Sequence, residues 1–64
     1  MNFEINKEFY IIDATSNHPG ITFVFDESGQ TIHTEENCIC FKTQKEAQDL
    51  IDKKGWDWAG IMEL

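Results

Sequence analysis

The sequence contains no arginine, one proline, and no apolar run near the roughly 18 residues that a membrane span needs. All five cations are lysines, against 12 Asp and Glu, so the formal net charge is -7. Nucleic-acid-binding proteins gain most of their affinity from Lys and Arg on phosphates, and Arg is the main reader of bases. The composition therefore predicts no direct binding to nucleic acid and no attraction to anionic membranes.

The chain has only two cysteines, Cys38 and Cys40, and its N-terminus lacks the basic and apolar regions of a signal peptide. Residues two apart on a strand point in parallel and seldom reach the geometry of a disulfide. We therefore expect reduced thiols and a cytoplasmic protein. The chain of 64 residues is expected to form a single domain over residues 1–64, with little buried surface to stabilise it.

Turn residues divide the first half of the chain into three predicted strands. The first is a run of apolar β-formers, typical of a strand buried on both faces, and Phe3 and Ile5 would extend it or form an arm. The second alternates in polarity, and the turn Asp26-Glu27-Ser28-Gly29 joins it to the third in a hairpin. The strands are expected over residues 8–15, 21–26 and 30–35, with a turn at 16–20 and a bulge or loop at 35–37.

The strongest local signal is the capping box Thr43-Gln44-Lys45-Glu46. In this motif the Thr43 side chain accepts from the Glu46 N–H, and the Glu46 carboxylate accepts from the Thr43 N–H. Gly55 suits the position just after a helix, and two lysines before it complement the helix dipole. The predicted helix spans residues 44–54, with one apolar stripe at Ala47, Leu50 and Ile51.

With a last strand over residues 58–64, these elements predict a small α+β domain in the order β-β-β-α-β. Its sheet is expected to be mainly antiparallel, with one helix packed on one face. A helix of about three turns covers only one face, so the other is expected to expose apolar side chains. Exposed apolar surface usually marks a partner, either another protein or a second copy in a homodimer.

The stretch Phe41-Lys42-Thr43-Gln44-Lys45-Glu46-Ala47 resembles the F-x-T-x-x-E-A helix start of many small phage and mobile-element proteins. Those proteins open with a short apolar strand, like Phe9-Tyr10-Ile11-Ile12 here, and end on a short strand, like residues 59–64. The resemblance covers most of the chain in layout and seven residues in motif. It implies a phage or mobile-element origin and a place in the host cytoplasm, but no common activity. Proteins of this group are often basic, whereas this chain is acidic.

No pattern of catalytic or metal-binding residues stands out. Cys38 and Cys40 with His18 and His33 could make a Cys2His2 set, but one residue separates the thiols instead of two to four. His33 with either thiol could form a catalytic dyad, but nothing supplies an oxyanion hole. We expect surface histidines, no catalytic residue, no metal and no cofactor, so the chain is not predicted to be an enzyme. A small metal–thiolate protein is the most distant alternative.

Acidic residues occur in pairs, and rows of acids on a strand or a helix can approximate a line of backbone phosphates. Side chains two apart on a strand lie about 6.8 Å from each other, and side chains three apart on a helix about 5–6 Å. Small acidic phage proteins that imitate DNA are a known class, and the size and charge of this chain look like theirs. A surface that merely keeps the protein in solution explains the same charge. The pairs are Asp26 and Glu27, Glu35 and Glu36, and Asp49 and Asp52.

The stretch Trp56-Asp57-Trp58 is the most distinctive local feature. Side chains two apart on a strand share a face, so both rings could form one surface, and Trp is enriched at binding hot spots. In the alternative, one ring caps the core after Gly55 and the other packs on the helix end.

The leading hypothesis is a small non-enzymatic binding protein, encoded by a phage or mobile element, that binds and modulates a host protein with a basic surface. Nuclease, restriction and transcription components fit this description, and complementary charge would speed their encounter with the chain. The predicted contacts are the two tryptophans and the six acids named above. The alternative is a self-associating accessory domain, a homodimer without a host target.

Overall fold

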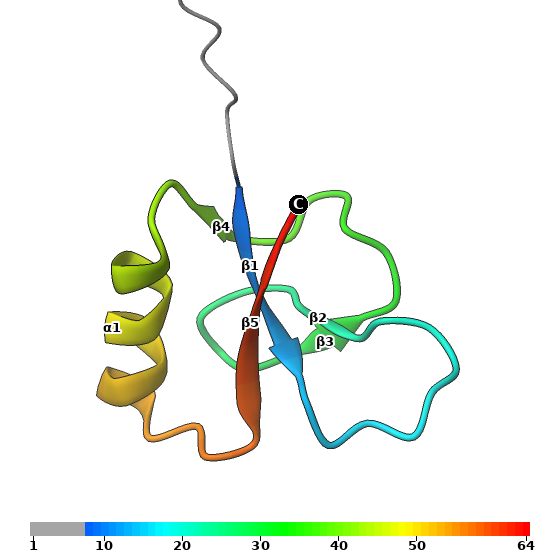
Figure 1. The fold of residues 1–64 in the computed structure, drawn as a ribbon. Coiled ribbons are helices and arrows are strands. Elements are labelled where there is room, and N and C mark those ends of the chain that lie inside the picture. The colour runs from blue at the N-terminus through cyan, green and yellow to red at the C-terminus, as the bar shows by residue number, and fades with distance from the viewer. Residues whose placement is uncertain (1–7) are drawn as a thin grey trace, which may run out of the picture.

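The computed structural model describes residues 8–64, so Phe3 and Ile5, expected near the first strand, lie outside the described residues. The described residues form an antiparallel five-stranded sheet and one helix, which confirms the predicted α+β class (Figure 1). In chain order the elements are β1 (Phe9–Asp13), β2 (Phe23–Val24), β3 (Thr31–Ile32), β4 (Cys40–Phe41), α1 (Gln44–Lys54) and β5 (Ala59–Glu63).

Strand β1 is the centre of the sheet. On one edge β5 pairs with its whole length, from Phe9 opposite Glu63 to Asp13 opposite Ala59. On the other edge β4 pairs with the first two residues of β1, and β2 pairs with Ile12. Strand β3 pairs with β2 on the outside. Because β1 has neighbours on both edges and apolar side chains on both faces, its sequence is a continuous apolar run.

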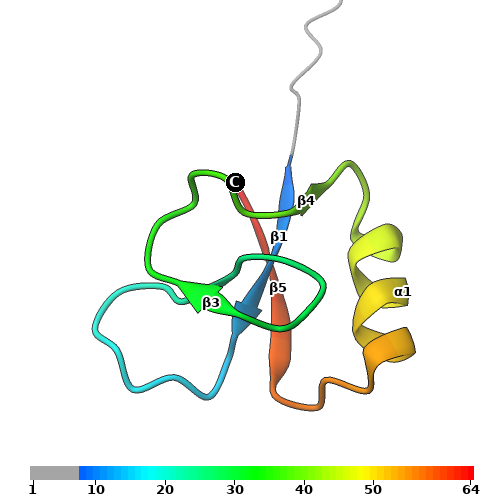
Figure 2. The same ribbon diagram turned by 180° about the vertical axis from the view of Figure 1, so that it is seen from behind.

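Alternation along the strands divides the apolar residues between the two faces of the sheet. On the face that α1 covers, Ile11 and Val24 from the sheet pack with Ala47 and Ile51 from the helix to form the buried core. Figures 1 and 2 show α1 on one side of β1 and β5, and the loop between β1 and β2 on the other. Partly buried side chains surround the core: Phe9, Ile39, Phe41, Leu50, Trp56, Trp58, Ala59 and Ile61.

The face opposite the helix carries a smaller apolar layer. Tyr10 and Phe23 are buried there, with ring centroids 5.5 Å apart in an edge-on contact. On this face Ile21, Ile32 and Leu64 remain 37%, 36% and 51% exposed. The expectation that one short helix leaves apolar side chains exposed on the other face is therefore confirmed.

The strands differ from the prediction in number and length. The sequence reading missed β4, so the predicted order β-β-β-α-β becomes β-β-β-β-α-β. The second and third strands, expected over residues 21–26 and 30–35, each pair for only two residues. Strands β2 and β4 share one edge of β1, which leaves each of them a short length to pair with. The last strand begins at Ala59, not at the predicted residue 58.

Both predicted ends of the helix are confirmed. Thr43 Oγ1 accepts from the Glu46 N–H at 3.2 Å, although residues 8–64 contain no return bond from the Thr43 N–H to the Glu46 carboxylate. At the other end Gly55 adopts φ 68°, which costs glycine little because it has no Cβ. The N–H groups of Gly55 and Trp56 donate to the carbonyls of Asp52 and Ile51 at 3.2 and 3.1 Å, a Schellman motif.

We predict that Thr43→Ala lowers the free energy of unfolding by about 1 kcal/mol, because the Glu46 N–H loses its side-chain acceptor. Urea denaturation followed by circular dichroism measures the change. Thr43→Ser is the matched control, because it keeps the hydroxyl and should lose only a few tenths of that amount. An unchanged urea midpoint in Thr43→Ala would contradict the assigned cap.

Candidate functional site

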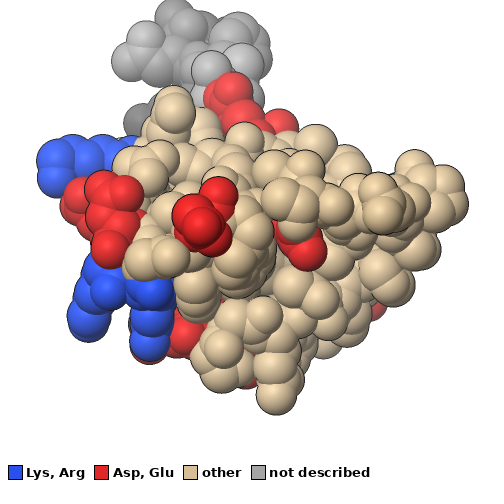
Figure 3. Space-filling model, turned by 90° about the horizontal axis from the view of Figure 1, so that it is seen from below, with Lys and Arg blue, Asp and Glu red and all other residues tan. Residues whose placement is uncertain are grey.

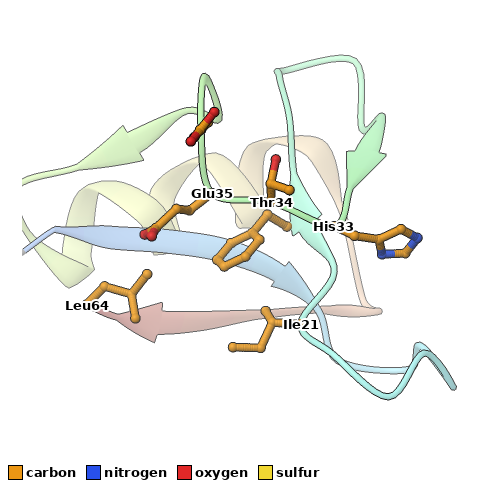
Figure 4. Close-up of a pocket in the computed structure, with 7 residues that line it drawn as sticks. Ile21, His33, Thr34, Glu35 and Leu64 are labelled. Carbon is orange, nitrogen blue, oxygen red and sulfur yellow. The ribbon is translucent and has the colours of Figure 1, made fainter.

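A hollow of about 430 Å³ lies on the face of the sheet opposite the helix. It forms where β2, the segment after β3 and the end of β5 come together (Figure 4). In that view Glu35 and Leu64 lie toward one end of the hollow, and Ile21 and His33 toward the other. The hollow is lined by Ile21, Phe23, His33, Thr34, Glu35, Glu36 and Leu64.

The apolar part of the hollow is fixed by the sheet. Phe23 is only 6% exposed and lies in β2, opposite Ile12 of β1. Leu64 follows β5, and its backbone exchanges hydrogen bonds of 2.9 and 3.2 Å with Glu8. Because these backbones are paired, the apolar surface is held in place before any ligand arrives.

The acidic part of the hollow comes from the loop after β3, where the sequence predicted a bulge or loop. Its backbone turns at Asn37, which has φ 64°, a conformation that Asn tolerates better than most residues. The Cys38 N–H donates to the Glu35 carbonyl at 3.3 Å, and the Cys38 thiol donates to the Thr34 carbonyl at 3.1 Å. The folded loop presents Glu35 and Glu36, both exposed, at the wall of the hollow.

Tyr10 packs against Phe23 on this face, and nearby carboxylates affect the pKa of its hydroxyl. Its hydroxyl donates to Glu8 Oε2 at 2.7 Å. That hydrogen bond, then burial, then the charges of Glu8, Cys40 and Glu35 raise the pKa of Tyr10 to about 12. The hydrogen bond and the nearby negative charges both favour the neutral hydroxyl over the tyrosinate.

Charge is distributed unequally over the described residues. The segment 42–57, which contains α1, has four lysines and four carboxylates, and the lysines gather on the α1 side of the molecule (Figure 3). The rest of the described chain has no lysine and seven carboxylates. Among the described residues, the excess of acidic over basic side chains therefore lies in the sheet and its loops, which contain Glu8, Asp13, Asp26, Glu27, Glu35, Glu36 and Glu63.

The two histidines meet at the side of the hollow, a contact that the sequence reading missed. Their rings stack with centroids 3.7 Å apart and an angle of 11° between planes. His18 Nδ1 accepts from the Gly20 N–H at 3.0 Å, and His33 Nδ1 lies 3.4 Å from the buried Thr22 hydroxyl. The stack ties the loop before β2 to the end of β3. Both histidines are exposed, as predicted, but no periodicity of the sequence relates them.

The four residues considered as a Cys2His2 set are not gathered at one point. Across residues 8–64, no three His, Cys, Asp or Glu side chains are placed to hold one metal ion. Both thiols are free, and burial, followed by the charge of Glu35, raises the pKa of Cys38 above its ordinary value. A raised thiol pKa disfavours the thiolate that nucleophilic catalysis needs.

The remaining predicted contact acids lie away from the hollow, and most have local partners. Asp26 Oδ1 accepts from the backbone N–H and hydroxyl of Ser28, and the hydroxyl bond is the main cause that lowers the Asp26 pKa. Asp49 pairs with Lys45 at 3.0 Å. Of the six acids, the structure brings only Glu35 and Glu36 to the hollow. The other four are Asp26 and Glu27 in the hairpin turn and Asp49 and Asp52 on α1.

Trp56 and Trp58 form a half-buried pair on the helix side of the sheet. Their ring centroids are 5.3 Å apart and both rings pack against the core. Trp56 also covers the hairpin turn, since a Cβ on Gly29 would meet its ring at 3.5 Å. A second, shallow hollow of about 280 Å³ includes Trp56 and Ile51 at the end of α1. These contacts favour the alternative in which the tryptophans pack against the core. Neither tryptophan lines the acidic hollow.

No protein-family model, curated protein or solved structure matches this chain. No helix within residues 8–64 has the length and apolar character to cross a membrane.

We predict that Tyr10 titrates with a pKa of about 12, against an ordinary value of 10.0. The neutral hydroxyl is favoured in the folded state, so its contribution to stability is complete below pH 10 and is lost as pH rises through about 12. Tyrosinate absorbance measures the titration without ambiguity, because the chain has one tyrosine. Glu8→Gln should move the pKa back toward 10, whereas the control Glu27→Gln should not. Equal pKa values in all three proteins would reject the Glu8 contact.

We predict that Trp56→Ala lowers the free energy of unfolding by about 2 kcal/mol, less than a fully buried Trp because the ring is half-exposed. The ring is lost from its contacts with the core and with the hairpin turn at Gly29. Urea denaturation measures the loss, with Ile32→Ala, an exposed apolar residue, as the control that should change less. A Trp56 variant as stable as the Ile32 variant would exclude the packing role.

Proposed function

We propose that the chain is a non-enzymatic binding protein that holds a basic protein surface on the acidic half of its sheet, opposite the helix. The observation that carries the proposal is the hollow, which combines exposed apolar side chains with Glu35 and Glu36 in the part of the described chain, residues 8–41 and 58–64, that has no lysine. Interfaces typically combine such an apolar centre with a charged surround.

The charge distribution supports a protein partner with a basic surface. Charges closer than the ~8 Å Debye length of physiological salt are only partly screened, so Glu35 and Glu36, which line one hollow, would together attract a cationic surface and orient it. The helix side, with equal numbers of each charge, offers no such attraction. A partner should therefore approach the sheet face that α1 leaves uncovered.

DNA mimicry stays a narrower prediction within this proposal. A row of acids that imitates phosphates would have to come from the loops of the sheet. On α1, Asp49 is paired with Lys45 and Asp52 accepts from Gln48 at 2.9 Å, so these two acids are already engaged. Nuclease, restriction and transcription proteins remain the partner classes to which the acidic loops would be complementary. An origin in a phage or mobile element likewise remains a prediction from the sequence resemblance.

Self-association is the second candidate function. Exposed Ile21, Ile32 and Leu64 on one face favour it, because burying them against a second copy would add to a small core. The acidic residues on the same half oppose it, because two copies bring like charges together. Light scattering at micromolar concentration distinguishes the two cases. A dimeric mass, with a dimer fraction that rises with salt, supports self-association. A monomeric mass at low and high salt excludes it.

We predict that immobilised protein captures a basic partner from a bacterial lysate and releases it at about 1 M salt, where the Debye length is only ~3 Å. The triple variant Glu27→Gln, Glu35→Gln, Glu36→Gln should lose most of this capture. The control triple variant Asp49→Asn, Asp52→Asn, Asp57→Asn makes the same change of net charge on the helix side and should keep it. Circular dichroism confirms that both variants fold.

Two results would overturn the proposal. One is a partner that both triple variants retain equally or lose equally, because the acidic half of the sheet would then have no special part. The other is a complex that high salt does not weaken, because charge would then not drive it.

A further inference from the structure

We propose that the hollow receives one basic side chain, Lys or Arg, of the protein partner. The aliphatic stem would lie on Ile21, Phe23 and Leu64, and the cationic head would lie at Glu35 and Glu36. This inference rests on the proposed function and names the chemical group that the acidic half of the sheet recognises. Lys and Arg have the matching form, because each carries a charged head on an apolar stem.

The apolar lining selects for a side chain with a stem. Ile21 and Leu64 are 37% and 51% exposed at the hollow, whereas Phe23 beneath them is only 6% exposed. A small inorganic cation would leave the two exposed side chains in water. A stem of three or four methylene groups would cover part of them and gain the free energy of apolar burial.

The polar lining selects for positive charge. Glu35 and Glu36 line the hollow, and the backbone of Glu8, whose carboxylate accepts from the Tyr10 hydroxyl, pairs with Leu64 of the lining. All four lysines of the described residues lie in the segment 42–54, and none of them lines the hollow. A guanidinium or ammonium group from a partner would therefore meet carboxylates that no lysine of the described chain neutralises.

The volume and the charge argue against other occupants. About 430 Å³ is enough for one side chain but lies near the lower end of the roughly 300–1,000 Å³ range of ligand pockets. A second copy of the chain would bring the same carboxylates to the hollow, and an acidic or phosphorylated ligand would be repelled. A basic side chain is the occupant that fits both the apolar and the acidic lining.

Short capped peptides test the inference by NMR titration of the full chain. The probes are Ac-Gly-Arg-Gly-NH2 and the same peptide with Lys, with uncharged citrulline and with norleucine, and methylguanidinium, which has a head without a stem. We expect saturable shifts at Ile21, Phe23 and Leu64 with the Arg and Lys peptides. The two uncharged peptides and methylguanidinium should bind about tenfold more weakly or not at all, since each lacks one of the two contacts.

Two double variants of equal net charge separate the hollow from general attraction to an acidic protein. Glu35→Gln with Glu36→Gln should weaken binding of the Arg peptide by about tenfold, the equivalent of one charge-assisted hydrogen bond. Glu46→Gln with Asp57→Asn changes exposed acids on the helix side that do not line the hollow, and should stay within about twofold of the wild type. Dispersed spectra of both variants show that they are folded.

The inference is overturned if both double variants weaken the Arg peptide equally, or if methylguanidinium or citrulline binds as tightly as Arg. Shifts that depend on protein concentration without any probe would also overturn it, because they would place a second copy in the hollow. The proposed function fails separately. If the wild type and the Glu35, Glu36 double variant capture a basic partner equally, the hollow is not the site of its basic side chain. The proposed function, binding of a basic partner, would still hold.

Discussion

The pairing of β1 on both of its edges is the constraint on which the rest of the fold depends. Strand β5 occupies one edge along its full length, so β2 and β4 must divide the other edge between them. Neither can therefore pair with β1 for more than a few residues. The chain between them leaves the sheet after β3 and returns at Ile39, whose N–H donates to the Phe25 carbonyl at 3.1 Å. That excursion places Glu35 and Glu36 beside Phe23 and so builds the hollow.

The two faces of β1 bury their side chains in different ways. Ile11 is fully buried under α1, in a core of aliphatic side chains from sheet and helix. Tyr10, one residue earlier, is 7% exposed although no helix covers it. Its ring packs against Phe23, and its hydroxyl donates to Glu8. The face without a helix therefore combines aromatic packing with carboxylates, and the raised pKa of Tyr10 is the electrostatic consequence.

The sequence predicted best those features that depend on neighbouring residues. The helix over residues 44–54, its cap at Thr43 and its end at Gly55 follow from side chains within a few positions of each other. The hairpin turn at residues 26–29 is equally local, since Gly29 has φ 89° and Asp26 bonds to Ser28. Strand β4 is as short as β2 and β3, but a local turn marks the hairpin of those two, whereas β4 pairs with the distant Phe9 and Tyr10.

The candidate site depends on contacts between distant residues, and the sequence reading found only part of it. Glu35 and Glu36 were named for their charge, but nothing local relates them to Ile21 or Leu64, which line the same hollow. The stacked histidines are fifteen positions apart and belong to separate loops. The binding role of the tryptophans stays a prediction from residue type, and the structure adds that both half-buried rings pack against the core.

The location of the net charge follows from the secondary structure itself. A helix of three turns is marginal alone, and pairs such as Lys45 with Asp49 add stability to it. Lysines are therefore useful on α1, where they balance the acids. The sheet loops use carboxylates differently: Asp13 and Asp26 accept hydrogen bonds from the Thr15 and Ser28 hydroxyls and backbone N–H groups, which need no cation. The described residues therefore divide into the segment 42–57, with equal numbers of lysines and carboxylates, and the remaining sheet and loops, with seven carboxylates and no lysine.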